Sequence, residues 1–456
     1  MRIGSDGAVQ SLQGAVSDRL DHLSSRKVRF WAPFVLGLVM MGDSWDVGII
    51  GYVMPSLRQE WGLTPLQIGA IISAGFAGQL VGALLFGPLA EKFGRMRVLN
   101  IAILVMSVLS IGCAMARNPD LFTVLRFAQG VGFGGAVPVC VSYINELAPT
   151  ATRGRYFSLF QFLMVSGFAL CGFVGAVVIP EYGWRAMFLI GAFPILLSPL
   201  IAFTLPESPR WLASLGRVEA MNRALAKLGA QPVDPGVGAS VAPLAPRVPV
   251  SVLIAPGLRW LTLATCLLWF LTALVSYGFS TWTPTIYVDI FGLTLEKSLR
   301  YAAFTGVAYM LIPLVFAAVI DRFGRRPSGI VATASTLALL IVLALAGTRA
   351  PGLSVPLIAL GWIASGASFT LLWPYSAEIF PTEIRSTALG LCSATARLGS
   401  TLTPLVVAGV LSATASISAV FVALAIPTFV MVLLWLFGSR EMAKQRLDDP
   451  AAAPHP

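Results

Sequence analysis

The sequence of 456 residues contains few charged side chains, and this scarcity restricts the kind of protein that it encodes. Asp, Glu, Lys and Arg make up 11% of the chain, whereas soluble proteins contain roughly 25%. Hydrophobic residues make up 57%. Because so few charges cannot cover a surface that faces water, the composition excludes an ordinary soluble protein and indicates a surface that faces lipid.

Histidine and cysteine are scarce as well. The two histidines, His22 and His455, lie near the ends of the chain. The five cysteines all lie inside long apolar runs, and none has a C-x-x-C spacing. Since clustered ligands and a nucleophile–base pair are both missing, we expect no metal site, no cofactor, no disulfide framework and no enzyme activity.

Sorting signals are missing too. Residues 1–29 are polar and of mixed charge, without the apolar core of about 7–15 residues that a signal peptide has. The sequence also lacks any N-x-[ST] glycosylation acceptor. We therefore expect the first apolar run to act as its own insertion signal, and the missing acceptors favour a bacterial inner membrane.

Long apolar runs are abundant, and each has the length of about 20 residues that a membrane-spanning helix needs. They predict an all-α polytopic membrane protein with twelve transmembrane helices in two six-helix bundles. The expected spans are residues 30–53, 67–90, 98–116, 121–145, 155–179, 184–205, 258–281, 300–320, 328–347, 354–376, 386–410 and 414–438. The expected units are a tail (1–29), a first bundle (30–205), a connector (206–257), a second bundle (258–438) and a second tail (439–456).

The basic residues are distributed unevenly between the two sides of the membrane. If the amino terminus is inside, 23 of the 31 Lys and Arg fall in cytoplasmic segments and six in external segments. This excess follows the positive-inside rule and predicts that both termini are cytoplasmic. The net charge of +10 therefore reflects topology. No basic patch interleaved with aromatic residues indicates nucleic-acid binding.

Two short signatures each occur twice. GPLAEKFGRMR at 87–97 has its counterpart in DRFGRR at 321–326, with 230 positions between Glu91 and Asp321. E-x-x-P-T-x-x-R at 146–153 recurs at 378–385, an offset of 232. Within each half the two signatures lie 55 and 57 residues apart. Paired halves of a hydrophobic chain are typical of secondary transporters.

The signatures lie at cytoplasmic ends of the expected helices and carry charges of both signs. Acidic side chains can cap a neighbouring helix amino terminus, and arginines can pair with carboxylates or lipid phosphates. We expect these residues to form a charge lock that opens and closes as the halves move. The alternative is that the loop charges only set the orientation of the helices in the membrane. The lock residues are Glu91, Arg95, Glu146, Arg153, Asp321, Arg325, Glu378 and Arg385.

The segments at 87–97 and 321–326 resemble the loop motif of the major facilitator superfamily, and RFAQG at 126–130 resembles its fourth-helix motif. PESPRWL at 206–212 and both E-x-x-P-T-x-x-R segments resemble the branch shared by sugar porters, organic-ion transporters and metabolite:proton symporters. DSWDVGIIGY at 43–52 is most similar to bacterial niacin transporters and, further off, to aromatic-acid:proton symporters. The resemblance covers residues 30–438 and implies the major facilitator fold.

Three ionisable residues near the middle of the first-half spans are candidates for proton coupling, because an ionisable group at a helix centre costs roughly 2.5–3.5 kcal/mol to insert. Asp43 and Asp46 are three positions apart and share a helix face, and Arg126 matches the depth of Asp46. In similar sugar porters, residues at the positions of Asp46 and Arg126 form an ion pair for gating or coupling; a static bridge is the alternative. Asp43 has no obvious partner, and burial favours the protonated form of an unpaired carboxyl group.

Arg397 lies near the centre of the eleventh expected span, with no acidic residue nearby on the same helix. Its guanidinium group cannot be neutralised by deprotonation. The resemblance to organic-ion transporters places Arg397 where cation carriers have an acid and anion carriers a base. We therefore expect an anionic substrate bound by Arg397, while pairing with an acid from another helix is the alternative.

Aromatic residues and two amides are further candidates for the substrate site. Aromatic faces can stack on a planar ring and hydroxyl groups can orient its polar edge, although aromatics in membrane spans often serve packing alone. Organic-ion transporters have substrate contacts at the positions of Trp269 and Tyr309. The candidates are Trp269, Tyr277, Tyr301, Tyr309, Trp373, Tyr375, Gln129 and Gln161. The glycine run at 130–135 is expected to allow close helix packing.

Together these features predict a secondary transporter that imports a small aromatic monocarboxylate with protons by alternating access, with nicotinate as the first candidate. Another aromatic or organic acid is the alternative within transport. A sugar is disfavoured, because Arg397 would be an unpaired charge beside a neutral substrate. A non-transporting receptor on the same fold is the alternative from another class. We expect a monomer in the lipid bilayer whose partners are the substrate and protons, and no nucleic acid.

Overall fold

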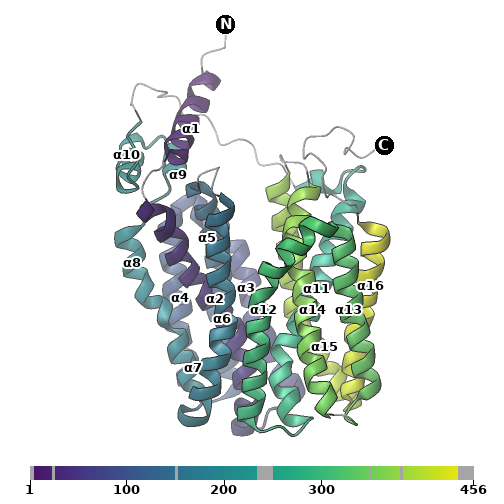
Figure 1. Cartoon of the computed structure of the whole chain (residues 1–456). Coiled ribbons are helices and arrows are strands. Elements are labelled where there is room, and N and C mark those ends of the chain that lie inside the picture. The colour runs from purple at the N-terminus through teal and green to yellow at the C-terminus, as the bar shows by residue number, and fades with distance from the viewer. Residues whose placement is uncertain are drawn as a thin grey trace.

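The structure is a computed structural model that describes residues 5–22, 26–148, 153–233, 250–349, 351–380 and 384–439. Helices make up nearly all of this part of the chain, and they form two bundles that stand side by side (Figure 1). The described residues contain no β-strand. The predicted all-α class with two bundles is therefore confirmed.

The first bundle begins at the second helix of the chain. It contains α2 (Arg26–Trp61), α3 (Pro65–Phe93), α4 (Arg95–Met115), α5 (Pro119–Leu147), α6 (Arg153–Tyr182) and a sixth membrane element made of α7 (Trp184–Gly191), η2 (Phe193–Leu196) and α8 (Leu197–Thr204). Pro194 in η2 cannot donate a backbone hydrogen bond, which accounts for the break between α7 and α8.

The second bundle repeats this order after the connector. It contains α11 (Arg259–Asp289), α12 (Leu295–Phe323), α13 (Arg325–Ala346), α14 (Pro351–Ile379), α15 (Arg385–Thr414) and a last element made of α16 (Ile417–Leu433) and the π-helical turn η4 (Leu434–Gly438). In the described residues, eleven helical elements are long and apolar enough to cross a membrane. The sequence predicts twelve spans, and the twelfth corresponds to α12. Some side chains of α12 lie outside the described residues, so α12 is not among the eleven.

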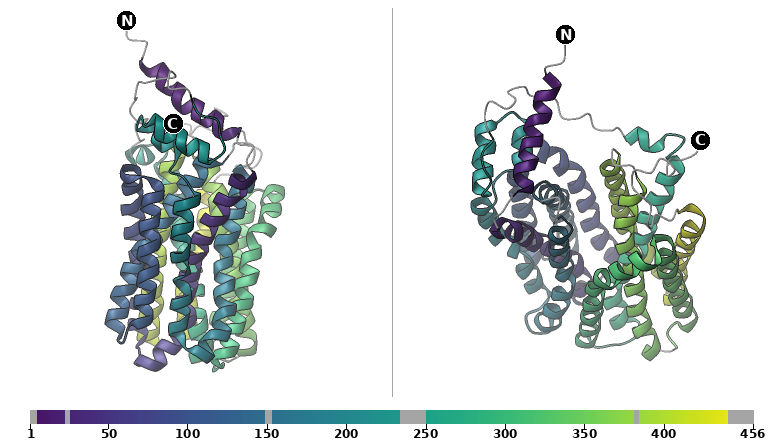
Figure 2. Two further views of the ribbon diagram at one scale, coloured as in Figure 1. Left: turned by 90° about the vertical axis from the view of Figure 1, so that its left-hand side faces the viewer. Right: turned by 45° about the horizontal axis from the view of Figure 1, so that its top comes forward.

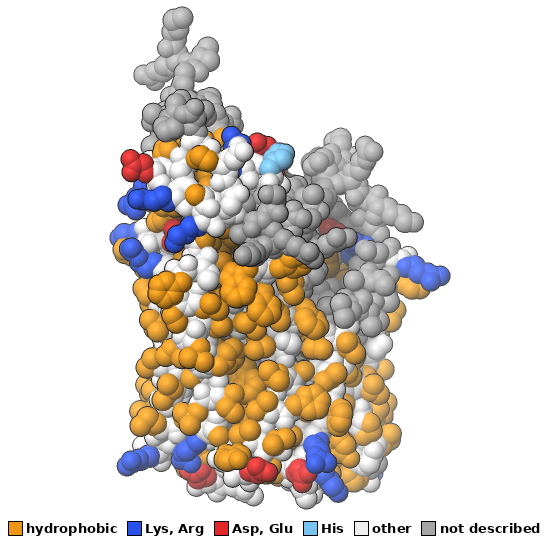
Figure 3. Space-filling view, turned by 60° about the vertical axis from the view of Figure 1, so that its left-hand side comes forward, with side chains coloured by type: hydrophobic (Ala, Val, Ile, Leu, Met, Phe, Trp, Pro, Cys, Tyr) orange, Lys and Arg blue, Asp and Glu red, His pale blue; other side chains and the backbone are white. Residues whose placement is uncertain are grey.

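The outer surface suits a bilayer. Figure 3 shows a broad band of hydrophobic side chains, with basic and acidic side chains gathered at both ends of the bundle. Leu84, Phe203 and Phe437 are among the large apolar side chains that stay exposed. An exposed apolar band bounded by charge is what a chain that spans a membrane requires, because lipid tails replace water around it.

Short polar and proline signals start several helices. At α3, Thr64 and Gln67 form a capping box in which the Thr64 hydroxyl accepts from the Gln67 backbone, and Pro65 follows as the first helical residue. At α5, the side chain of Asn118 accepts a hydrogen bond from the backbone of Leu121 at 2.8 Å. These caps satisfy backbone donors at the helix ends.

The connector and the first tail contain helices that pack on the first bundle. The connector carries α9 (Pro209–Ser214), α10 (Val218–Lys227) and η3 (Val250–Ile254), and the tail carries α1 (Ser5–Asp21). Val16 and Leu20 of α1 share an apolar cluster with Trp211 of α9 and Leu225 of α10. The sequence predicted only a polar tail where α1 lies, because the apolar face of α1 is short.

Three helix pairs join the bundles: α2 with α11, α3 with α15, and α6 with α12. We call the end that carries α9 and α10 the connector end; Figure 2 shows the ribbons of the two bundles diverging towards it. At the other end the backbones approach closely, since a Cβ atom at Gly69 would lie 2.8 Å from the carbonyl oxygen of Pro404. An ion pair between Arg58 and Asp289 also joins the bundles there.

Candidate functional site

The first bundle holds a buried ion pair at its centre. Nη1 of Arg126 on α5 lies 2.5 Å from Oδ1 of Asp46 on α2, and both side chains are almost fully buried. The same nitrogen donates to Oε1 of Gln129 at 2.6 Å, and the guanidinium lies 5.8 Å from the centre of the Phe188 ring. The Asp46–Arg126 contact that the sequence indicated is present, and its part in proton coupling stays a prediction.

Asp43 lies one turn before Asp46 on α2 and is 8% exposed. Its Oδ1 atom has no hydrogen-bond partner among the described residues. The charges that act on it are the positive charge of Arg397, from the other bundle, and the negative charge of Asp46. Asp43 is therefore a buried carboxyl group whose charge interacts with that of Asp46 in its own bundle and with that of Arg397 in the other.

Arg397 is half-buried on α15 and reaches across to the first bundle, where its Nη1 atom donates a hydrogen bond to Oε1 of Gln79 on α3. The contact between Arg397 and Gln79 therefore joins α15 to α3 at the boundary between the bundles.

A small cavity opens beside this point and is lined from both bundles. Its volume is about 30 Å³, well below the roughly 300 Å³ at which ligand pockets begin. The lining residues are Phe168, Ser276, Tyr277, Ser280, Tyr309, Trp362 and Phe369. The rings of Phe76 and Tyr277, one from each bundle, lie 5.0 Å apart. The two bundles are therefore closed around this cavity.

The predicted aromatic residues divide into three groups. Tyr277 and Tyr309 line the cavity. Trp269 and Trp373 pack edge to face at 4.9 Å, and Nε1 of Trp269 donates to Ser376 at 2.8 Å. This second group packs mainly within its own bundle.

The remaining two aromatic residues, Tyr301 and Tyr375, do not line the cavity. Tyr301 is 47% exposed, and the ring of Tyr375 packs on Trp435 at 4.9 Å. Tyr301 precedes Tyr309 by about two helical turns, so the two lie at different depths. Tyr375 follows Trp373 by two positions, which turns its side chain to another face of α14.

The two predicted amides also lie apart from the cavity. Gln129 is 1% exposed and belongs to the Arg126 network. Gln161 is half-buried on α6, about two turns before Phe168. The amide that does meet Arg397 is Gln79, which the sequence reasoning missed. The only sequence feature that could have indicated Gln79 is that it is an uncharged polar residue in an apolar span. Gln67 and Gln129 share this feature, so it does not single out Gln79.

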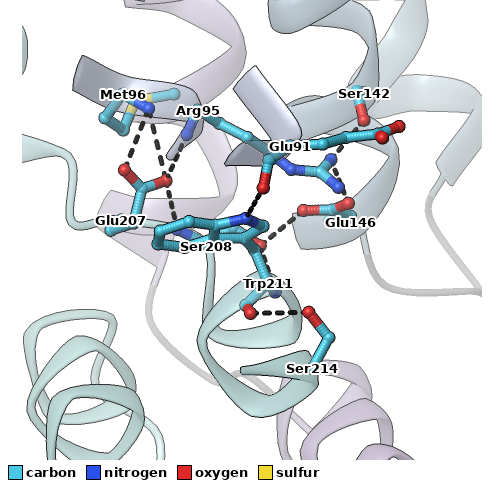
Figure 4. A network of polar contacts seen from close by, with 9 residues as sticks. All are labelled: Glu91, Arg95, Met96, Ser142, Glu146, Glu207, Ser208, Trp211 and Ser214. Atoms are coloured by element: carbon cyan, nitrogen blue, oxygen red, sulfur yellow. Dashed lines mark hydrogen bonds and ion pairs between the residues drawn. The ribbon is translucent and has the colours of Figure 1, made fainter. Parts of the chain in front are cut away.

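Figure 4 shows the first-half lock. Arg95 at the start of α4 pairs with Glu146 near the end of α5 and also donates to Ser142. Oε2 of Glu146 accepts from the hydroxyl of Ser208 at 2.5 Å. Glu207 in the connector accepts from the backbone nitrogen of Arg95 at 2.8 Å and so caps α4. The sequence reasoning missed Glu207, although it singled out the segment that contains it.

The glycine before α4 is required by this geometry. Gly94 has a φ of 103°, and a Cβ atom there would lie 2.5 Å from Oε2 of Glu207. Nε1 of Trp211 donates to the backbone oxygen of Glu91 at 2.6 Å. The connector is therefore attached to the loop motif through Glu207 and Trp211.

The second half repeats the pair. Nε and Nη2 of Arg325 each lie 2.9 Å from an oxygen of Glu378, a bidentate arrangement. Arg326 donates to the backbone oxygen of Trp435 at 3.2 Å. Of the other predicted lock residues, Arg385 begins α15, while the side chains of Arg153 on α6 and Asp321 on α12 lie outside those described.

Comparisons with known proteins agree with this architecture. The family model described as "Sugar (and other) transporter" matches residues 32–448. The gallate transporter of Pseudomonas putida is 34% identical over 405 residues, covering 87% of this chain and 88% of that protein. The niacin transporter NiaP of Acinetobacter baylyi is 30% identical over 394 residues, covering 85% and 89%. A solved D-xylose-proton symporter matches with a TM-score of 0.74 at 22% identity, covering 90% of this chain and 98% of that one.

The two six-helix bundles, the family model and the transporter relatives together identify a multi-pass membrane transporter of the major facilitator superfamily, and not an enzyme. Within that superfamily, the chain belongs to the Sugar (and other) transporter family.

Proposed function

We propose that the protein imports a small aromatic monocarboxylate together with protons. Two relatives are a gallate transporter and a niacin transporter, and both of these cargoes carry one carboxylate on a six-membered aromatic ring. A D-xylose-proton symporter shares the fold. The carboxylate is the feature that gallate and niacin share, so a site common to these two transporters would recognise it.

The observation that carries the proposal is the position of Arg397 at the boundary between the bundles, facing Asp43 and Gln79. A guanidinium group offers a fork of donors to a carboxylate and stays charged in a closed cavity. When Asp43 is ionised, it offsets part of the charge of Arg397. When Asp43 takes up a proton, that charge becomes available to the substrate anion, so proton and substrate bind together.

The side chains that line the closed cavity have the chemistry to contact the ring of such a substrate once the bundles separate and the cavity widens. Tyr277 and Phe369 supply aromatic rings, and Ser280 and Tyr309 supply hydroxyl groups. Hydroxyl groups can bond to the ring nitrogen of nicotinate or to the ring hydroxyls of gallate. Nicotinate and gallate are the two substrates that we propose to test first.

Alternating access follows from the arrangement of the bundles. From the excess of basic residues we infer that the connector end faces the cytoplasm of a bacterial inner membrane, the side on which both termini are expected. The Arg58–Asp289 pair and the approach at Gly69 then close the periplasmic side. The cavity would open to the periplasm as these contacts separate and the two bundles approach each other at the connector end, within a single monomer.

Replacement of Arg397 tests the proposal. Arg397→Ala should abolish nicotinate and gallate binding, because loss of one side of a desolvated charge pair costs roughly 2–5 kcal/mol. Arg397→Lys should restore binding only in part, since a point charge lacks the fork. Isothermal titration of the purified protein measures both variants.

Nicotinamide provides the matched ligand control, because it has nearly the shape of nicotinate without its charge. A folded Arg397→Ala protein that keeps its affinity for both carboxylates within about twofold, or about 0.4 kcal/mol, would show that the anion is bound elsewhere. Uptake into proteoliposomes separates a transporter from a receptor, since only a transporter accumulates cargo.

A further inference from the structure

Gln79 is the point at which the first bundle touches Arg397. It lies on α3, and its side chain is 2% exposed. Its Oε1 atom accepts a hydrogen bond from Nη1 of Arg397, a residue 318 positions away in the other bundle. This bond therefore joins the two halves at the middle of their helices, beside the cavity.

The backbone of Gln79 is held firmly by α5. A Cβ atom at Gly134 would lie 1.9 Å from the backbone oxygen of Gln79, and one at Gly130 would lie 3.1 Å from its nitrogen. Only glycine permits this approach, and the predicted role of the 130–135 run in helix packing is confirmed. The close packing of α3 on α5 therefore sets the position of the Gln79 backbone in the first bundle.

The amide of Gln79 offers Arg397 the same kind of acceptor as a carboxylate, but a weaker one. Its oxygen is neutral and fills one position of the guanidinium fork, whereas a carboxylate has two oxygens and a negative charge. A substrate carboxylate should therefore displace Gln79. In the absence of substrate, Gln79 supplies a hydrogen-bond acceptor to one donor of the half-buried Arg397 guanidinium group.

We propose that Gln79 is a built-in substitute for the substrate carboxylate, which satisfies Arg397 in the empty carrier and so allows the empty carrier to close and reorient. This inference rests on the proposed function, in which Arg397 binds the substrate. Net transport requires the carrier to return empty through the closed state. Exchange returns the carrier loaded, so it does not need Gln79.

Three variants of the full chain in proteoliposomes test this role, with nicotinate and gallate as probes. For Gln79→Ala, efflux into substrate-free buffer should fall at least tenfold while exchange stays within twofold, because a bond to a charged group changes an equilibrium about tenfold or more. Its affinity for the carboxylates should rise about threefold to tenfold, because the competing acceptor is gone. Gln79→Glu should lower that affinity at least tenfold, since a fixed carboxylate competes for Arg397.

Ser73→Ala is the matched control, because Ser73 is a buried polar residue of the same helix whose hydroxyl has no hydrogen-bond partner in the described residues. It should leave efflux, exchange and affinity unchanged. If Gln79→Ala lowers efflux and exchange equally, or changes neither, Gln79 is not a substitute ligand. This alanine arm decides the matter even if Gln79→Glu does not fold.

Arg397→Ala distinguishes a failure of the proposed function from a failure of the role proposed for Gln79. If that variant keeps carboxylate binding, the proposed function is wrong. If it loses binding while Gln79→Ala keeps the wild-type ratio of efflux to exchange, the proposed function stands and only the role of Gln79 is wrong.

Discussion

At the connector end, the first half pairs Arg95 with Glu146, and the second half pairs Arg325 with Glu378 at the corresponding place in its own repeat. At the centre, the halves differ. The first half pairs Asp46 with Arg126 inside one bundle. The second half presents Arg397, whose hydrogen-bond acceptor Gln79 belongs to the other bundle.

This difference indicates how the duplicated unit is used. Each loop ion pair lies within its own bundle, so both copies can keep it. The proposed substrate site would lie between the bundles and bind a substrate without two-fold symmetry, so the two copies would contribute different groups. We therefore expect changes at the centre to affect binding and coupling, and changes at the loops to affect rates.

The largest effect is expected at the paired centre of the first half. Arg126→Ala leaves the carboxylate of Asp46 buried without its partner, which should lower the free energy of unfolding by about 3–5 kcal/mol. Thermal unfolding in detergent measures the loss. Asp46→Asn with Arg126→Gln should recover most of this stability but not proton-driven accumulation. Wild-type stability in Arg126→Ala would show that the pair does not hold the bundle.

Asp43 should act on coupling and leave the fold intact. Asp43→Asn keeps the shape of the side chain and removes the group that takes up a proton, so accumulation driven by an imposed pH gradient should fall at least tenfold while counterflow continues. Tracer uptake into liposomes with and without the gradient measures both. Gradient-driven uptake at the wild-type level would remove Asp43 from the coupling mechanism.

The two loop locks should affect rate more than affinity, and the first more than the second. Arg95→Ala and Arg325→Ala should each slow transport several-fold, with carboxylate affinity within about twofold, since both locks lie far from the cavity. Asp321→Ala should behave in the same way.

Glu207→Gln is the variant that separates the halves, because among the described side chains an acidic cap of this kind is seen at α4 and not at α13. It should cost about 1 kcal/mol of stability and slow transport. Stopped-flow uptake and titration together make the measurement. A large loss of substrate binding in a folded lock variant would contradict the separation of loops from centre.

The smallest effect is expected at the pair between Arg58 and Asp289, because its side chains are 39% and 25% exposed. Such a pair contributes roughly 0.2–1 kcal/mol. Arg58→Ala and Asp289→Ala should each shift the carrier slightly towards the form open at that end. A double-mutant cycle on accessibility to a thiol reagent measures the coupling, and strictly additive effects would show that the ion pair does not contribute to closure.

Much of this architecture could be predicted from the amino-acid sequence. Twelve apolar runs indicated the helices, because a backbone in lipid must satisfy its hydrogen bonds within each span. The equal spacing of the duplicated signatures indicated two similar bundles. Asp46 and Arg126 could be paired in advance because two buried opposite charges at one depth each need the other.

Other features depended on how the helices dock. Two contacts could not be predicted from residue spacing. Arg95 and Glu207 are 112 positions apart, and Gln79 and Arg397 are 318 apart, so no helical periodicity relates the partners. Tyr301 and Tyr375 looked equivalent to Tyr309 in sequence, yet depth and helix face separate them. Residue type and spacing determined which groups enter the membrane, while the rotation of each helix and the contact between bundles decided which of them meet, because those depend on packing across the whole molecule.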